Sequence, residues 1–188
     1  MSVPLSLLAI LDEEPTYGLD LKKEFEARTG GVWPLNVGQV YTTLSRLERD
    51  GMVRVGRDEG DESQKVYRIT RAGRARLKRW LSRPTEPRRP GRDELVLKLV
   101  TAAARGEAAQ VIQAERKGAL RSLQGFTRLK HDASGDADLG WMFLLDAMIF
   151  QTEARVRWLD ACEARLGKAK APARGKRAAA PERSEVSR

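Results

Sequence analysis

The hydrophobic pattern of the first 31 residues predicts two helices. Residues 3–11 are almost all apolar and are followed by three acidic residues and a proline, as expected for a short buried helix that ends in a turn. Apolar side chains then recur every fourth residue, which places them on one helix face: Tyr17, Leu21 and Phe25. We expect Thr16 to be the N-cap of this second helix and the pair Gly30-Gly31 to end it.

A third helix has the clearest boundaries. Asn36 and Gln39 have the spacing of a capping box, and Gly51 stands where a C′ glycine belongs. The apolar residues between them step by three, four and three positions and predict a core face: Val37, Val40, Leu44 and Leu47. The opposite face then presents Gln39, Thr42, Ser45, Arg46 and Arg49 to solvent, with Tyr41 on the flank. Arginine and glutamine side chains on an exposed helix can bind guanine and adenine in the major groove.

Two short β-branched segments and a basic helix follow. Residues 52–55 and 65–70 predict a two-stranded hairpin whose connection is rich in glycine and acidic residues, and residues 70–81 predict a helix. The whole order is that of a winged helix-turn-helix, a mainly α fold in which the third helix enters a DNA groove and the hairpin is the wing. The wing tip carries Asp58, Glu59, Asp61 and Glu62, so we expect phosphate contacts from the stem, through Arg54, Lys65 and Arg68.

The C-terminal half predicts three helices, over residues 93–103, 107–130 and 137–166. The last helix has a heptad seam: Met142, Leu145, Ile149, Thr152, Val156, Leu159, Glu163 and Leu166. A second apolar stripe runs beside it: Trp141, Leu144, Met148 and Trp158. One partner helix cannot cover both, so we expect one face to pack within the subunit and the other against a second copy. We assign dimerisation to Met142, Leu145, Ile149, Val156 and Leu159.

Charge follows this division of the chain. Of the formal net charge of +9, a block of +5 lies in residues 36–82, and residues 93–166 carry −1. We predict a DNA-binding domain over 1–82, a Pro-rich linker over 83–92, a helical dimerisation domain with an effector role over 93–166, and a disordered basic tail over 167–188. Excess positive charge in a foldable region favours a polyanionic partner, with double-stranded DNA first. The tail either adds non-specific attraction to DNA or serves solubility alone.

The chain lacks the residues that several classes of protein function require. A single Cys162 and a single His131 exclude internal disulfides and His- or Cys-based metal sites, and there is no phosphate-binding glycine loop or paired nucleophile and base. We therefore expect no enzyme, no metal and no cofactor. No apolar stretch reaches membrane-spanning length, and the N-terminus lacks the basic leader of a secretory signal, so we expect a cytoplasmic protein without membrane contact.

The strings NVGQVYTTLSRLERDGMV and KVYRITRAGR, with PTYGLDL upstream, resemble the DNA-binding region of PadR-family transcriptional regulators, and the match covers residues 3–82. The resemblance implies a homodimer that binds an inverted-repeat (palindromic) operator, as a repressor released by a small ligand. It also implies that Tyr41 contacts DNA and that the C-terminal helices form the dimer. The acidic wing tip departs from a phosphate-binding wing. It leaves open a second hypothesis, a winged-helix module that contacts a transcription partner protein through that tip.

The aromatic residues allow two interpretations. Trp80, Trp141 and Trp158 could line a pocket for a small aromatic or apolar effector, but ordinary packing is favoured for each of them. We expect Trp33 to be a hinge residue packed against the core and His131 to be an ordinary surface residue. Cys162 on the last helix is expected to be a small buried hydrophobe, with a redox-active cross-dimer disulfide as the less favoured alternative.

Overall fold

The structure of the chain is a computed structural model, which describes residues 3–57, 65–85, 93–133 and 138–168. Its residues group into two compact units, one made by 1–91 with 125–150 and the other by 92–124 with 151–188. This grouping divides the predicted helical domain between both units. The acidic wing tip, most of the predicted linker and nearly all of the predicted basic tail lie outside the described residues.

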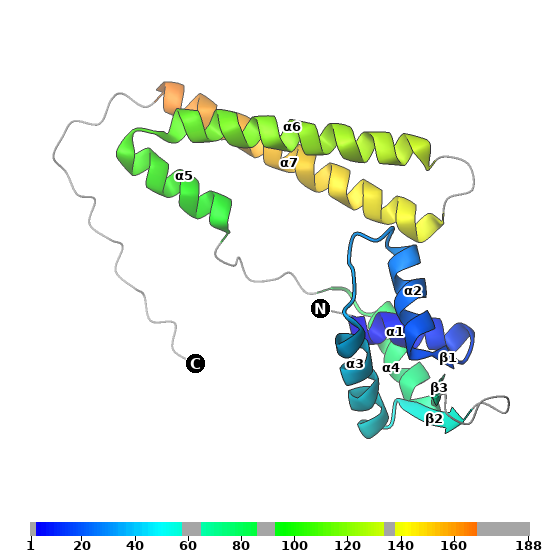
Figure 1. Cartoon of the computed structure of the whole chain (residues 1–188). Coiled ribbons are helices and arrows are strands. Elements are labelled where there is room, and N and C mark those ends of the chain that lie inside the picture. Colours follow the sequence, from blue (N-terminus) through cyan, green and yellow to red (C-terminus); the bar gives the residue numbers. More distant parts are fainter. Residues whose placement is uncertain (1–2, 58–64, 86–92, 134–137, 169–188) are drawn as a thin grey trace, which may run out of the picture. The chain divides into compact units, whose positions relative to one another are not determined.

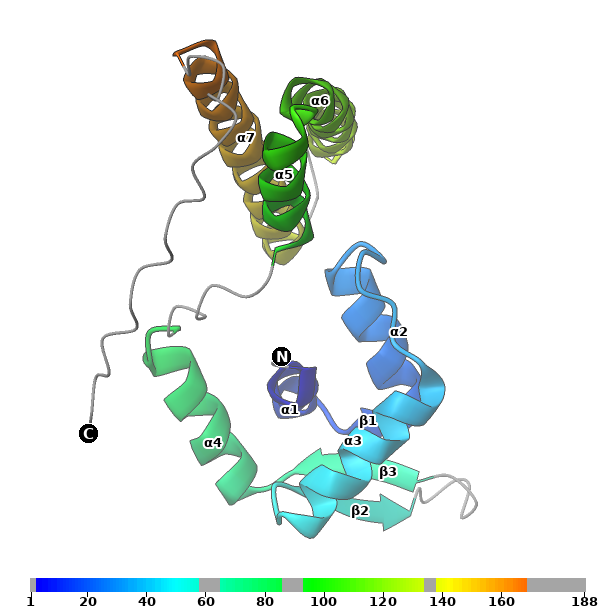
Figure 2. The ribbon, with the colours of Figure 1, turned by 90° about the vertical axis from the view of Figure 1, so that its left-hand side faces the viewer.

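The winged helix-turn-helix predicted from the sequence is confirmed (Figures 1 and 2). Its elements follow in the order α1 (Val3–Glu13), β1 (Thr16–Tyr17), α2 (Gly18–Arg28), α3 (Val37–Arg49), β2 (Val53–Arg57), β3 (Lys65–Ile69) and α4 (Arg71–Ser82). Among the described residues no polar or charged side chain is buried, and the core of this part is built on fully buried leucines of the first three helices: Leu7, Leu8, Leu21 and Leu44. The predicted core face of α3 is confirmed for Val40, Leu44 and Leu47, which are buried. Val37 is 43% exposed, because it is the first residue of the helix and precedes the turn that packs against the core.

The first strand corrects the prediction for Thr16. Thr16 and Tyr17 are extended and pair with Tyr67 and Val66 of β3, so the sheet has three antiparallel strands in the order β1-β3-β2. Helix α2 therefore begins only at Gly18, and its N-cap residue is Tyr17, which makes no side-chain capping bond. Thr16 is not a cap, because its backbone is held in the sheet.

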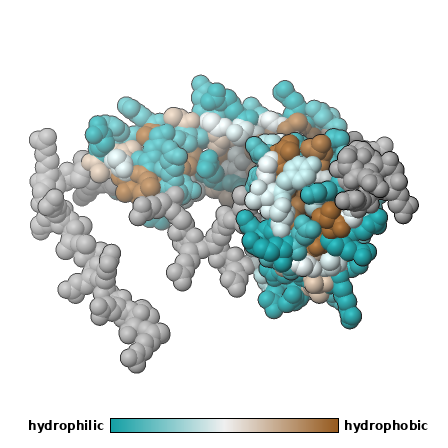
Figure 3. Space-filling model, turned by 60° about the horizontal axis from the view of Figure 1, so that its bottom comes forward, coloured by the Kyte–Doolittle hydropathy of each residue, from teal (hydrophilic) through white to brown (hydrophobic). Residues whose placement is uncertain are grey.

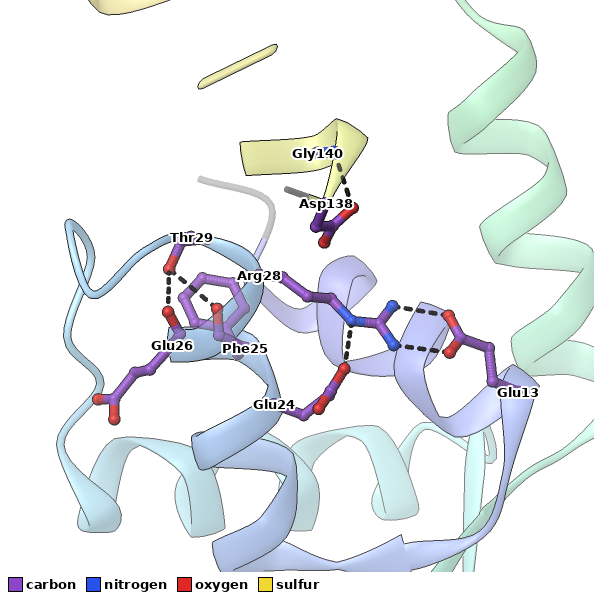
Figure 4. Close-up of polar contacts among 8 residues, drawn as sticks. All are labelled: Glu13, Glu24, Phe25, Glu26, Arg28, Thr29, Asp138 and Gly140. Atoms are coloured by element: carbon purple, nitrogen blue, oxygen red, sulfur yellow. Dashed lines mark hydrogen bonds and ion pairs between the residues drawn. The ribbon is translucent and has the colours of Figure 1, made fainter. Parts of the chain in front are cut away.

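Arg28 joins the first two helices (Figure 4). Its two terminal nitrogens donate to the two carboxylate oxygens of Glu13 at 2.6 Å each, and its Nε donates to Glu24 at 2.8 Å. The hydrogen bonds from Arg28 hold the pKa of the Glu13 carboxyl below its usual value. This bidentate pair connects the end of α1 to the end of α2 across the turn that contains β1.

The three predicted C-terminal helices are confirmed as α5 (Glu94–Arg105), α6 (Ala108–Asp132) and α7 (Leu139–Lys168). In the unit that contains α5, the core consists of Leu95, Leu99, Ile112 and Leu159, with Cys162 half-buried against it. Figure 1 shows α6 and α7 side by side and antiparallel. Arg116 of α6, only 18% exposed, donates to Asp160 at 2.7 Å and to Glu163 at 2.5 Å, and Lys130 pairs with Asp146.

Two residues of the predicted dimer seam face the inside of the chain. Leu145 and Leu159 are both 0% exposed, and Glu163 of the same seam is paired with Arg116. The heptad seam is thus largely the face that packs on the chain's own helices, and Leu145 and Leu159 have no surface left for a second copy. Met142, Ile149 and Val156 are half-buried. The most exposed apolar residues of α7 lie outside this seam, at Leu139, Phe143 and Phe150, which are each 63–65% exposed, whereas Trp158 and the seam residue Leu166 are 36% and 37% exposed.

No helix among the described residues has the length and hydropathy needed to cross a bilayer.

Candidate nucleic-acid interface

Helix α3 is capped at both ends, so its backbone presents the residues of its outer face from defined positions. The Oδ1 atom of Asn36 accepts a hydrogen bond from the backbone N–H of Gly38 at 2.8 Å. At the other end Gly51 has a φ of +71°, and Met52 N–H donates to the carbonyl of Leu47 at 2.8 Å, which is a Schellman closure. Within the described residues Gln39 does not return the capping-box bond, and its side chain is exposed. All six predicted reading residues of α3 are exposed: Gln39, Tyr41, Thr42, Ser45, Arg46 and Arg49.

The hydrogen bonds of these six residues limit what each can offer a ligand. The Thr42 hydroxyl donates to the carbonyl of Gly38 at 2.7 Å, so it presents a methyl group and an acceptor outward rather than a donor. Arg49 lies 3.5 Å from Asp50, a loose and exposed pair. The Arg46 side chain has no hydrogen-bonding or ionic partner within the described part of the chain. Arg46 therefore keeps its full set of donors for an external acceptor.

Tyr41 lies against Gly18, and this contact explains a glycine at that position. A Cβ at Gly18 would stand 2.7 Å from Cε1 of Tyr41 and 3.2 Å from its hydroxyl oxygen, closer than side chains approach one another. The Tyr41 ring is 39% exposed, with its inner edge over α2. Behind it, burial raises the pKa of the Tyr67 phenol, and the neighbouring Tyr41 and Glu48 raise it further, so Tyr67 stays neutral.

The wing stem carries an unfavourable charge pair. Arg54 of β2 and Arg68 of β3 are cross-strand neighbours in the register, and both are exposed. Like charges directly opposite each other in an antiparallel pair destabilise it. Within the described residues neither arginine has a carboxylate partner. A polyanion placed along this face would relieve the repulsion.

A shallow depression connects α2, α3 and the wing. Tyr17, Gly18, Asp20, Lys23, Tyr41 and Lys65 are among the residues that line it, so the structure brings the predicted residues Tyr41 and Lys65 together. Lys23 is a member of this group that the sequence pattern missed, and it is 75% exposed although it pairs with Asp20 at 2.8 Å. Its position on the outer face of α2, two residues after the buried Leu21, was the signal that could have indicated it.

The base of the wing is fixed by Thr70. Its side chain accepts from the N–H of Gly73 at 3.1 Å as the N-cap of α4, and its hydroxyl donates to the carbonyl of Gly51 at 2.7 Å. The backbone N–H of Thr70 donates to the carbonyl of Met52 at 3.0 Å. One residue thus joins the end of α3, the hairpin and α4. These bonds tie the base of the wing to the C-terminal end of α3.

The three tryptophans considered for an effector pocket fall in both compact units, Trp80 and Trp141 in one and Trp158 in the other. Trp80 lines a cavity of about 590 Å³ together with Trp33, and neither Trp141 nor Trp158 is among the lining residues. Trp158 belongs to the other compact unit and is 36% exposed. Trp33 is 54% exposed, so it is not packed against the core as expected, because the turn before α3 holds it at the surface. His131 is a surface residue as predicted, with 87% of its side chain exposed.

The described surface around these elements is mainly hydrophilic. In the space-filling view of Figure 3, polar residues surround a few apolar patches. No group of three or more His, Cys, Asp or Glu side chains suited to a metal ion occurs in the described ranges.

Comparisons with known proteins agree with this arrangement. Residues 7–79 match the model of the transcriptional regulator PadR-like family, and residues 91–167 match a model named virulence activator alpha C-term. A probable transcriptional regulator of Mycobacterium tuberculosis is 30% identical over 180 residues, which cover 85% of this chain and 95% of that protein. The negative transcriptional regulator PadR of Bacillus subtilis is 25% identical over 175 residues, 87% of this chain and 96% of that protein.

Solved structures of the Bacillus subtilis protein share the fold. Its complex with p-coumaric acid gives a TM-score of 0.71 at 20% identity, and its complex with operator DNA gives 0.68 at 19% identity. Each comparison covers 88–89% of this chain and 99% of the other. These relatives are transcriptional regulators rather than enzymes, in line with the expectation from the sequence. The chain belongs to the PadR-like family of transcriptional regulators.

Proposed function

We propose that this regulator is a sequence-specific repressor that binds an inverted-repeat operator as a homodimer and leaves it when a small molecule binds. The observation that carries the proposal is the set of exposed cations without carboxylate partners among the described residues, on α3 and on the wing beside it: Arg46, Arg54, Lys65 and Arg68. These unpaired cations lie on a capped helix and on the hairpin beside it. In a complex with a DNA duplex they could pair with phosphate groups, which the isolated protein does not offer.

The division of labour follows from position. Arg46 and Arg49, with Gln39, Thr42 and Ser45, stand on the outer face of α3 and are the proposed base readers. Arg54, Arg68 and Lys65 on the wing, with Tyr41, are the proposed phosphate contacts. The related Bacillus subtilis regulator has been crystallised in complex with operator DNA, which supports the same ligand class here.

A homodimer is supported by the apolar surface of α7. Leu139, Phe143 and Phe150 are separated by four and seven residues, so they fall within about 40° of one another around the helix. All three are more than 60% exposed, and a group of exposed large apolar side chains on one helix face usually marks a contact with another protein. We propose this face, in place of the buried seam, as the contact with the second copy. Two copies at a set separation read two half-sites, which a single winged helix cannot do.

The test is a selection of duplexes from a random pool with the full chain, followed by anisotropy titrations of the selected duplex against a permuted duplex of equal composition. We expect a preference of at least about a thousandfold for the selected duplex. Arg46→Ala and Arg49→Ala should each remove about 1–3 kcal/mol of that preference. Arg121→Ala, which removes an exposed cation of α6, is the matched control. Equal affinity for both duplexes contradicts the proposal and favours a protein partner.

A further inference from the structure

The cavity beside Trp80 lies entirely within residues of the winged helix. It has a volume of about 590 Å³, is partly open to solvent and is lined by residues of α1, α2, α4, the turn before α3 and the first turn of α3. Ligand pockets for small molecules usually measure about 300 to 1,000 Å³. The volume suits one molecule with two or three fused or linked rings.

The lining chemistry restricts the occupant. Two indoles, Trp33 and Trp80, and the Phe25 ring provide flat apolar surface, and among the described residues no Asp, Glu, Lys, Arg or His lines the cavity. The polar side chains on its wall are those of Ser6 and Gln39. A carboxylate placed here would lose its hydration without gaining a cation, which is costly. Aromatic rings stack on indoles at little cost, so an uncharged planar molecule fits best.

The wall of the cavity is continuous with the start of α3. The N–H of Leu35, a lining residue, donates to Oε1 of Glu26 on α2 at 2.8 Å, and Glu26 is also paired with Lys22 at 2.7 Å. The next residue, Asn36, is the N-cap of α3, and Gln39 in the first turn returns to the cavity wall. A molecule in this cavity therefore contacts the segment 32–35 that leads into the capped end of α3, and it contacts Gln39, one of the residues that we propose to read bases.

We propose that this cavity binds an uncharged planar aromatic molecule and that its occupation shifts α3 and weakens DNA binding. The assignment rests on the proposed ligand-responsive function, although the binding itself can be tested without DNA. Trp80, one of the tryptophans considered for an effector pocket from the sequence, lines this cavity. Trp33 replaces Trp141 and Trp158 as the second indole.

The experiment is calorimetric titration of the full chain near neutral pH with two probes of matched shape, 2-naphthol, which is neutral, and 2-naphthoate, which is anionic. We expect saturable binding of 2-naphthol and binding of 2-naphthoate that is weaker by at least about tenfold. Trp33→Ala should weaken 2-naphthol binding by about tenfold or more, since the variant loses a stacking surface. Because Trp33 is 54% exposed, its removal should leave the fold intact, and Trp158→Ala is the control from the other unit.

The second measurement is the affinity for the selected duplex with and without saturating 2-naphthol. We expect a loss of affinity in the wild type and a smaller loss in Trp33→Ala. Absence of saturable 2-naphthol binding, equal binding of both probes, or binding insensitive to Trp33→Ala and Trp80→Ala overturns the proposal. If 2-naphthol binds only to a monomeric variant, the proposal is also overturned. That result would mean that a second copy of the chain covers the cavity in the wild type. Loss of DNA specificity with intact 2-naphthol binding would instead count against the proposed function alone.

Discussion

Gly73 lies directly against the backbone of Met52. A Cβ at Gly73 would stand 2.3 Å from the carbonyl oxygen of Met52 and 2.7 Å from Cγ1 of Ile69. The first turn of α4 thus packs on the base of the wing with no room for a side chain, at the place where Thr70 also binds. The nearest atom in the way is backbone, and it cannot move aside as a flexible side chain can.

Gly73→Ala should therefore destabilise the protein by about 1–3 kcal/mol, the usual cost of inserting a methyl group into a filled site. Urea denaturation followed by circular dichroism measures this. Gly125→Ala is the control, because no atom lies within 4 Å of a Cβ placed there and a helical alanine is favoured over glycine by up to about 1 kcal/mol. Equal effects of the two substitutions would show that the packing at Met52 is looser than described.

Gly18→Ala should reduce DNA affinity through Tyr41. The added methyl group displaces the Tyr41 ring, while the stability of the fold changes little because the ring is partly exposed and can swing outward. The test is a double-mutant cycle of Gly18→Ala and Tyr41→Ala, with the duplex affinity as readout. We expect Gly18→Ala to have an effect in the wild-type background and almost none in the Tyr41→Ala background. Additive effects would mean that Gly18 acts independently of Tyr41.

Arg54→Ala and Arg68→Ala should each lower the slope of log affinity against log salt by about one, and weaken binding to all duplexes alike. Either substitution also removes a like-charge neighbour across the strands, so the isolated protein should become no less stable. Titrations at four salt concentrations and thermal unfolding without DNA give both quantities. An unchanged salt slope in both variants would remove the wing stem from the interface.

If the proposed homodimer forms through this face, Phe143→Glu combined with Phe150→Glu should make the protein monomeric. The two carboxylates would stand on the exposed apolar face of α7 and would be desolvated in a dimer without partners. Light scattering after size-exclusion chromatography measures the mass, and circular dichroism checks that the helices remain. Gln151→Glu, at an exposed position next to Phe150 in sequence but off this face, is the control. A double variant that stays dimeric would exclude this face as the dimer contact.

Glu163→Gln should reduce the stability of the helical part at neutral pH. The hydrogen bond from Arg116, chiefly, holds the pKa of the Glu163 carboxyl below its usual value. Such a group stabilises the fold fully above the pKa that it has in the unfolded chain, and this contribution is lost as the pH falls through the lower pKa of the folded state. Wild type and variant should thus differ at neutral pH and converge in acid, as measured by urea midpoints across that range. Glu14→Gln, which removes an exposed carboxylate from the other unit, is the control.

The elements of this fold were largely predictable, because each helix of the winged helix has its own local signal. Asn36 and Gly51 mark the ends of α3 in the sequence, and the structure places both in capping geometry. The prediction for Thr16 was wrong because a two-residue strand is defined by its partner, β3, which lies about fifty residues away in sequence and leaves no periodic signal.

The site could be predicted from the sequence only where the helical repeat of a single helix determines which residues face solvent. The exposed residues of α3 follow from the positions of Val40, Leu44 and Leu47. Helix α7 has apolar residues on more than one face, and its period alone could not say which face its own chain covers. Leu145 and Leu159 were therefore assigned to the dimer contact although their own chain buries both side chains. Trp33 and Trp80 are 47 positions apart, and only the packing of α1 and α4 brings them to one cavity.

The strand order β1-β3-β2 leaves β2 at the edge of the sheet. An edge strand exposes a row of unpaired N–H and C=O groups, to which a strand of another molecule can add. Arg54, charged and exposed on β2, makes such an addition unfavourable because stacked copies would bring equal charges together. The cation proposed to contact phosphate would thus also protect the free protein against aggregation, and a variant without it should precipitate at lower concentration even though its isolated wing is under less electrostatic strain.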